Sequence, residues 1–324
     1  MASQNDRATS HADPLRRCDQ CRKPQGEYVK LKRCARCSTG VYCSKECQKA
    51  AWAIHKFACL TYSESNTDNG LRPLRNAEVH RFGFQTIDEV PRVLKDFMVS
   101  HSWALHAYTR AELLLRGGPG HMHDPPKLLE IHLKCLCSSG YSATTNPALT
   151  FKFLKTRWWT VEEYTSDPDR ARSWQNFAPT LEVAHTRGSG GEHFFGMLPV
   201  VFTVQNVHSL HVINLYAQHH PIPGLFGDYD EEGRRRLLTN GLALCVSSIN
   251  LGIPLRDTEA RRVPELLPGR FVRSKGRWVW EPLFAGWDQY LAGPRGTAAV
   301  DDLLVQCEHE YLDVQRLLFL LSLL

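Results

Sequence analysis

Apolar residues recur at steps of three and four along residues 87–116, and this spacing predicts an amphipathic helix. Pro91 fits the first turn of that helix, and the run from Gly117 to Gly120 is expected to end it. The same periodicity predicts helices over residues 231–249 and 300–324. In the last of these, one apolar stripe consists of Val300, Leu304, Cys307, Tyr311, Val314, Leu318 and Leu321.

Strands are predicted where the hydrophobic pattern has a period of two residues. Apolar and polar residues alternate over residues 128–137, and residues 197–204 and 210–216 are rich in β-branched and aromatic side chains. The short segment 205–209 between the last two predicts a hairpin loop. Weaker strand signals cover residues 149–159 and 180–186. Because helices and strands are interspersed without an internal repeat, the pattern indicates an α+β body.

A length of 324 residues corresponds to roughly two domains of about 150 residues. We expect a loose tail at residues 1–14, a small domain at 15–60, a polar linker at 61–76 and the body at 77–324. With 43% hydrophobic and 23% charged residues, the composition excludes a disordered chain. No apolar run approaches the roughly 20 residues that cross a bilayer, so no membrane association is expected. The first residues also lack the apolar segment of a secretory signal.

Cysteine is concentrated at one end of the chain. Seven of the 11 cysteines lie between Cys18 and Cys59, whereas a disulfide framework would spread them over the whole chain. This gradient predicts a small metal-binding module joined to a body that needs no disulfides. It also predicts a reducing location, the cytoplasm or the nucleus.

Charge separates the two parts as well. Residues 1–60 carry 12 Lys and Arg against 5 Asp and Glu, a formal +7, and the remainder is slightly acidic. Ionisation of seven thiols and binding of two Zn²⁺ would lower that excess to about +4. The basic balance is therefore modest, and it does not favour nucleic acid as a partner.

Eight residues in this segment form four pairs with the spacing of metal ligands. Tight turns hold the C-x2-C pairs, and pairs at i, i+4 share one face of a helix. Four pairs suffice for two closed tetrahedral sites, and thiolate-rich ligation favours structural Zn²⁺ over Ca²⁺ or Mg²⁺. Spacing alone leaves open whether neighbouring or alternating pairs share an ion. The candidate ligands are Cys18, Cys21, Cys34, Cys37, Cys43, Cys47, His55 and Cys59.

A helix is expected to carry the later ligands. Ser44 is a good N-cap for a helix through Trp52, and Glu46 would lie in its first turn, where the helix dipole favours an acid.

The complete run Cys-x2-Cys-x12-Cys-x2-Cys-x5-Cys-x3-Cys-Gln-x3-Trp-x2-His-Lys-x2-Cys resembles a MYND-type zinc finger. The Val41-Tyr42-Cys43-Ser44 step and the Cys47-Gln48 step fit that pattern too, and the long gap after Cys21 is expected to enlarge a loop. The resemblance implies alternating sites: Cys18, Cys21, Cys43 and Cys47 bind one zinc, and Cys34, Cys37, His55 and Cys59 bind the other. The fold class is then α+β, with a small two-zinc finger beside a larger mixed α/β body.

MYND-type fingers act as protein-interaction modules, often for proline-rich peptides. The resemblance implies that Gln48 and Trp52 contribute to the peptide groove. An indole face packs well on a proline ring, and a Gln amide can hydrogen-bond an extended backbone. Trp52 could instead be the apolar anchor of a small core. We therefore expect an adaptor-like protein whose partners carry Pro-x-Leu-x-Pro-like segments.

Some MYND-type fingers stand within SET-type lysine methyltransferases, so an enzymatic body is the alternative. That class has an Asn-His pair followed by Cys, and no Asn-His step occurs here. Serine-hydrolase, phosphate-loop and zinc-protease motifs are also missing. Three pairs of histidines could act in acid–base chemistry: His121 and His123, His208 and His211, and His219 and His220. Overall, the sequence favours a role without catalysis.

Two further features qualify this prediction. Residues 264–268 read Pro-Glu-Leu-Leu-Pro, which resembles the peptides that MYND-type grooves bind, so docking of Pro264–Pro268 on Gln48 and Trp52 is one hypothesis. A proline-bounded surface turn is the simpler interpretation. The layout of an N-terminal finger and a separate body resembles fungal MYND-finger proteins.

Overall fold

The computed structural model describes residues 13–64, 72–137, 141–142, 144–191, 193–258, 265–292, 297–305, 307 and 314–324. The strands are β1 (Asp13–Pro14), β2 (Lys32–Arg33), β3 (Val41–Tyr42), β4 (Lys127–Cys135), β5 (Phe151–Thr160), β6 (Phe194–Val204), β7 (Val207–His219), β8 (Leu255–Thr258), β9 (Glu265–Ser274) and β10 (Arg277–Pro282). The α-helices are α1 (Lys45–Glu64), α2 (Arg72–His80), α3 (Glu89–Ser100), α4 (Ser102–Leu115), α5 (Pro119–His123), α6 (Val161–Thr165), α7 (Pro168–Gly188), α8 (Glu231–Leu251), α9 (Trp287–Ala292), α10 (Thr297–Leu304) and α11 (Val314–Ser322).

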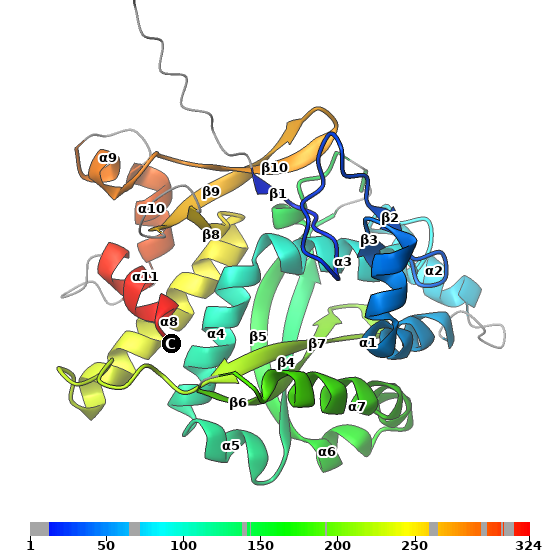
Figure 1. Ribbon diagram of the computed structural model, residues 1–324, viewed down its shortest axis with the longest axis horizontal. Helices are drawn as coiled ribbons and strands as arrows, with labels where there is room; N and C mark the ends of the chain where they lie inside the picture. Colours follow the sequence, from blue (N-terminus) through cyan, green and yellow to red (C-terminus); the bar gives the residue numbers. More distant parts are fainter. Residues whose placement is uncertain are drawn as a thin grey trace, which may run out of the picture.

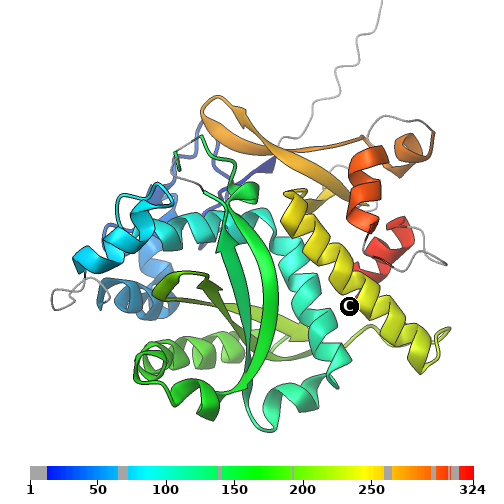
Figure 2. The ribbon, with the colours of Figure 1, turned by 180° about the vertical axis from the view of Figure 1, so that it is seen from behind.

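The body is built around the sheet β5-β4-β6-β7, in which only β4 and β6 run parallel. Alternation along β4 sends Leu129, Ile131 and Leu133 into the main core, which α3, α4 and α8 share. Leu128, on the alternate side of the strand, belongs to a separate cluster with Tyr164 of α6. The helices α6 and α7 lie on the other side of the sheet from α4 and α8 (Figures 1 and 2). The predicted α+β body is therefore confirmed as a sheet between two helical layers.

A second antiparallel sheet, β1-β10-β9-β8, is linked to the N-terminal end of the described chain. Asp13 pairs with Trp280, and the Leu15 N–H donates to the Trp278 carbonyl at 3.0 Å. Asp13 and Pro14, at the end of the expected tail, thus form a strand, and residues 1–12 lie outside the described part. This sheet packs with α8, α10 and α11 in a second core (Figure 1).

Most strand predictions are confirmed, and one is wrong. The 128–137, 149–159 and hairpin patterns correspond to β4, β5 and the antiparallel pair β6–β7. Residues 180–186 instead belong to α7. Asp167 caps that helix by accepting from the N–H groups of Asp169 and Arg170, and Pro168 stands in its first turn.

Two predicted helices are interrupted. The 87–116 pattern is divided between α3 and α4 by a bend at His101, whose buried ring nitrogen Nε2 lies 3.0 Å from the Ala148 carbonyl oxygen. The 300–324 pattern is divided between α10 and α11, yet Val300, Val314 and Leu318 are buried as its apolar stripe predicts. Tyr311 lies outside the described residues.

The expected linker at 61–76 is largely helical in its described part. No glycine or proline stands between Cys59 and Glu64, so α1 continues to Glu64, and α2 begins at Arg72. Residues 65–71 lie outside the described part. None of the described helices is both long and apolar enough to cross a bilayer.

Candidate metal centre

The finger consists of the hairpin β2–β3 and the helix α1. The Ser44 hydroxyl accepts from the Cys47 N–H at 3.2 Å, and Glu46 lies in the first turn of α1. This arrangement confirms the predicted cap, and it fixes the end of the helix that carries Cys47, His55 and Cys59.

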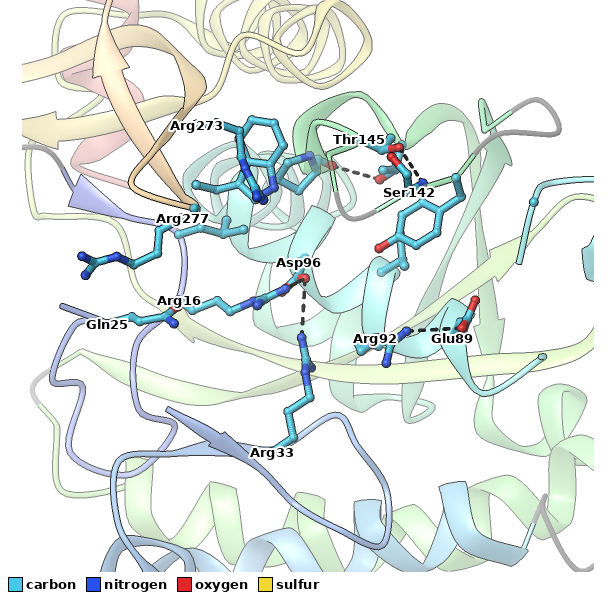
Figure 3. A pocket seen from close by; sticks show the side chains of 18 of the residues that line it. Arg16, Gln25, Arg33, Glu89, Arg92, Asp96, Ser142, Thr145, Arg273 and Arg277 are labelled. Carbon is cyan, nitrogen blue, oxygen red and sulfur yellow. Dashed lines mark hydrogen bonds and ion pairs between the residues drawn. The ribbon is translucent and has the colours of Figure 1, made fainter. Parts of the chain in front are cut away.

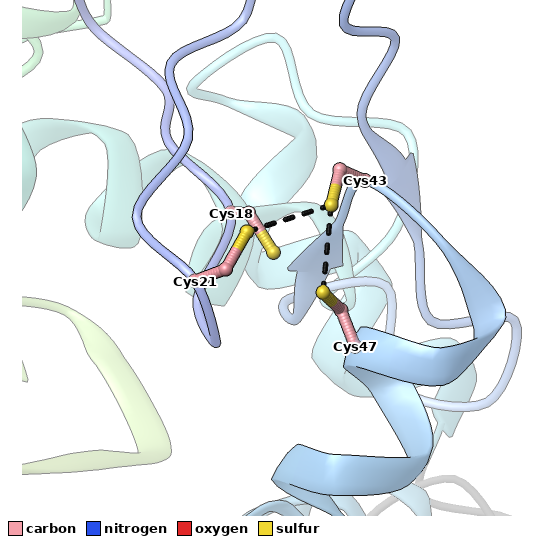
Figure 4. Close-up of side chains that lie close together, drawn as sticks. All are labelled: Cys18, Cys21, Cys43 and Cys47. Carbon is pink, nitrogen blue, oxygen red and sulfur yellow. Dashed lines mark hydrogen bonds between the residues drawn. The ribbon is translucent and has the colours of Figure 1, made fainter.

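The first ligand cluster consists of Cys18, Cys21, Cys43 and Cys47, whose four sulfurs lie within 4.8 Å of one another (Figure 4). The sulfurs of Cys21 and Cys43 are 3.6 Å apart, and those of Cys43 and Cys47 are 3.5 Å apart. Tetrahedral Zn²⁺ with Zn–S bonds of about 2.3 Å separates its sulfurs by about 3.8 Å. The spacing therefore fits a closed zinc site.

The second cluster consists of Cys34, Cys37, His55 and Cys59, also within 4.8 Å of one another. The sulfurs of Cys34 and Cys59 are 3.9 Å apart, and the Cys37 sulfur lies 3.6 Å from His55 Nε2. His55 and Cys59 come from successive turns of α1, as the i, i+4 spacing predicts. The alternating arrangement implied by the resemblance is confirmed, and the two clusters are two zinc-binding sites.

The two sites differ in burial. In the first, Cys18 is buried, Cys21 is exposed and the other two ligands are half-buried. In the second, three ligands are buried and only His55 is half-buried. A chelator therefore reaches the first site more easily than the second.

The electrostatics of the sulfurs show what a cation adds. Burial acts to raise the pKa of the Cys18 thiol, but N–H groups of Cys21, Cys43 and Gln20 lower it to about 6. Contacts with the other sulfurs, those of Cys47 and Cys21 first, raise the pKa of Cys43 to about 12. Burial and nearby sulfurs raise the pKa of Cys59 to about 12. Without a metal the sulfurs share protons, and Zn²⁺ replaces those protons.

Zinc affinity is therefore expected to fall on acidification. At pH 8 the metal-free finger keeps protons on Cys43 and Cys59, and a thiol must lose its proton to bind zinc. Displacement of at least one proton per ion weakens binding at least tenfold, roughly, for each unit of pH. Competition with a calibrated chelator between pH 8 and pH 6 measures this, and a constant affinity over that range would contradict it.

The hydrophobic core of the finger is small. Its small core consists of the buried cysteines and Tyr42, with a few half-buried neighbours such as Leu31. The Tyr42 ring packs edge-on against His55, with centroids 5.6 Å apart. A Cβ at Gly40 would lie 2.7 Å from the His55 ring, so this position needs glycine. Since so small a core cannot stabilise a fold alone, the zinc ions carry most of the stability.

Gln48 and Trp52 lie one turn apart on α1, so they share a face of the helix. Gln48 is half-buried, whereas the Trp52 side chain is 42% exposed. Trp52 touches His55, with ring centroids 5.9 Å apart, but its exposure is not that of a core anchor. Tyr28, in the long loop after Cys21, is 94% exposed, and no pattern in the sequence singled it out.

Charged contacts fix the finger on α3 of the body. Arg16 donates through Nε to Asp96 at 3.0 Å, and Arg33 lies 3.9 Å from the same carboxylate. Lys95 reaches Asp19 at 2.6 Å and the Thr39 carbonyl at 2.9 Å. These contacts were not predicted, because they join residues up to 80 positions apart that have no motif spacing.

Three histidines of the candidate pairs, His121, His211 and His219, each contact a different residue. The ring of His121 packs on Trp158, the half-buried His211 ring packs edge-on against Tyr164, and His219 accepts from Arg110 at 2.6 Å. The cavity that the described residues form between finger and body is lined by no histidine. Arg235 forms an ion pair with Glu232 near the start of α8.

The Pro264–Pro268 segment is not a surface turn in its described part. Residues 265–268 begin β9, Leu266 and Leu267 are buried in the second core, and Trp287 Nε1 donates to the Leu266 carbonyl at 3.1 Å. Pro264 itself lies outside the described residues. The segment's leucines are occupied by the body, which gives no support to docking on Gln48 and Trp52.

Comparison with known proteins assigns a family to the finger. Residues 18–59 match the family model described as MYND finger. "SET domain and MYND-type zinc finger protein 6" of Schizosaccharomyces pombe is 44% identical over 62 residues, which are 19% of this chain and 12% of that protein. "SET domain-containing protein 14" of Caenorhabditis elegans is 41% identical over 49 residues, 15% of this chain and 11% of that protein.

A SET and MYND domain-containing protein of Dictyostelium discoideum is 45% identical over 56 residues, 16% of this chain and 10% of that protein. The chain thus spans about one-tenth of the length of the curated relatives it matches. No solved structure matches this chain. The MYND-type finger is shown by these matches, and the similarity is confined to the N-terminal region.

Proposed function

We propose that this protein is a zinc-dependent interaction protein, whose finger binds a proline-containing segment of another protein through Gln48 and Trp52. The observation that carries the proposal is the exposure of Trp52. A large indole that is 42% exposed, on the helix that carries three zinc ligands and next to one of them, His55, is available for a partner. Trp is also enriched among residues that dominate binding energy.

The zinc sites supply rigidity to this surface. Trp52 contacts the ring of His55, and His55 is a ligand of the second site. The ion therefore fixes the helix turn that carries the indole, and a rigid aromatic loses little conformational entropy on binding. Gln48, one turn earlier, is placed to hydrogen-bond an extended backbone lying along α1.

The partner segment is expected to come from another chain. A proline ring packs on the indole face, and a Pro-x-Leu-x-Pro-like segment in an extended form offers backbone groups to the Gln48 amide. This chain's own Leu266 and Leu267 are buried in its second core. Thiolate ligands need a reducing environment, so we place this interaction in the cytoplasm or the nucleus.

The printed names of the relatives contain SET, but the match covers at most 19% of this chain and lies in the finger region. The shared feature is therefore the finger, which supports a recognition role for this chain.

The double variant Gln48→Ala, Trp52→Ala is expected to bind a synthetic Pro-x-Leu-x-Pro peptide at least about 30-fold more weakly than the wild type. Loss of a central aromatic contact costs on the order of 2 kcal/mol or more. Fluorescence anisotropy of the labelled peptide measures this at fixed salt.

Lys49→Ala is the matched control, since Lys49 is exposed on the same helix between the two positions. It should bind like the wild type, and both variants should keep two zinc ions. Equal binding by the double variant, or no binding of the peptide to the wild type, would contradict the proposal.

A further inference from the structure

A cavity of about 550 Å³ lies at the junction of the finger and the body. The finger contributes Arg16 and Arg33, α3 contributes Arg92 and Asp96, and the hairpin β9–β10 contributes Arg273 and Arg277. Figure 3 shows Arg16 and Arg33 converging on Asp96, with Arg273 and Arg277 on the hairpin side and Arg92 on the α3 side. The volume lies within the range of sites for small ligands.

The lining is strongly positive. Five arginines stand against two carboxylates, those of Glu89 and Asp96, so the described lining carries three excess positive charges. Asp96 serves both Arg16 and Arg33, and Glu89 lies 3.6 Å from Arg92. The arginines that give this balance come from the finger, from α3 and from the β9–β10 hairpin.

Four of the five arginines, Arg16, Arg33, Arg92 and Arg277, are half-buried, and the mutual repulsion of their guanidinium groups opposes folding. Docking of the finger requires only Arg16 and Arg33, which already share Asp96. Arg92 and Arg277 are half-buried in the cavity wall, where desolvation adds to the repulsion. An anion in the cavity would relieve both penalties.

We propose that this cavity binds a small phosphate-bearing molecule with at least two negative charges. The planar guanidinium fork matches the oxygens of phosphate in paired hydrogen bonds. The cavity lining includes Tyr141, Ser142 and Thr145, whose hydroxyls can donate to further phosphate oxygens. Trp278 adds an aromatic face to the same lining, which suits a ring attached to the phosphate.

This occupant would connect the two parts of the molecule. Its phosphate oxygens would be shared by arginines of the finger, of α3 and of the β9–β10 hairpin. Binding would thus stabilise the docked position of the finger. This cavity is distinct from the surface of Gln48 and Trp52, neither of which lines it.

Isothermal titration calorimetry of the full chain tests this, with pyrophosphate and ADP as probes in magnesium-free buffer at fixed ionic strength. We expect one saturable site for each probe. The double variant Arg92→Gln, Arg277→Gln should bind both probes at least tenfold more weakly. Arg172→Gln is the control, because Arg172 is an exposed arginine of α7 that forms no part of the cavity.

Citrate and adenosine distinguish the chemistry. Citrate has a similar charge but no phosphate, so it should bind at least tenfold more weakly than pyrophosphate, and adenosine alone should not bind. Absence of saturable binding of pyrophosphate and ADP would overturn the proposal, and so would an equal loss of affinity in the double variant and in Arg172→Gln. Binding of citrate as tight as that of pyrophosphate, or binding of adenosine alone, would overturn it too. If the double variant does not fold, the single variant Arg277→Gln is used instead, and it too should bind both probes at least tenfold more weakly.

Discussion

Removal of zinc by a strong chelator is expected to unfold residues 18–59 while the sheet β5-β4-β6-β7 and its helices stay folded. The eight ligands are held by a core of a few residues around Tyr42, and structural zinc contributes on the order of 10–16 kcal/mol in small fingers. The body has its own large core around Phe97 and Ile131, with no ligand in it. Limited proteolysis and circular dichroism with and without chelator measure the two parts separately.

The chelated protein should be cleaved rapidly within residues 18–59, and re-addition of Zn²⁺ should restore protection. Zinc should leave in two phases, because the site with exposed Cys21 is more accessible than the site of buried Cys34 and Cys59. A Cys307→Ser variant is the matched control, since Cys307 is a buried cysteine of the second core that is not a ligand. An N-terminal digestion pattern unaffected by chelator would refute the account of the finger.

The substitution Asp96→Ala is expected to destabilise the docking of the finger by about 2–3 kcal/mol. The Asp96 side chain is only 14% exposed and it holds Arg16 and Arg33 together, so its removal leaves two guanidinium groups facing each other. Loss of one partner of a buried ion pair costs about 3–5 kcal/mol, and partial exposure of the arginines lowers that figure. Urea unfolding followed by tryptophan fluorescence measures the change.

Asp169→Ala provides the comparison. Asp169 pairs with Arg172 at 3.6 Å, but both side chains are 73% exposed, and such surface pairs contribute at most about 1 kcal/mol. If Asp96→Ala changed the free energy of unfolding no more than Asp169→Ala does, the charged contact would not be what holds the finger in place.

The finger was predictable because zinc chemistry fixes both residue type and spacing. C-x2-C turns and i, i+4 pairs are local, so the ligands could be identified without knowledge of the fold. The pairing of the four ligand pairs was not local, and only the resemblance implied it. Ser44 was identified as a cap for the same reason, since a cap acts within one turn.

The body was less predictable where tertiary contacts override local pattern. Apolar periodicity continues through His101, but the buried ring that contacts the Ala148 carbonyl belongs to a bend that no local signal marks. Residues 180–186 alternate like a strand, yet the capped helix that begins at Pro168 includes them. In both places the secondary structure is determined by a contact or a helix cap. The residues that form it lie outside the short segment over which the hydrophobic pattern was read.

The finger–body junction could not be predicted at all. Arg16, Asp19, Lys95 and Asp96 are ordinary charged residues in the sequence, and only the fold brings them together. The same holds for the cavity, whose arginines come from the finger, from α3 and from the β9–β10 hairpin.

Native mass spectrometry of the purified full chain tests the central claim most directly, because it counts bound ions on the folded protein. The account predicts two Zn²⁺ per chain, falling to one in a Cys21→Ser, Cys43→Ser variant that keeps the second site. A folded wild-type chain carrying one zinc ion or none would contradict it.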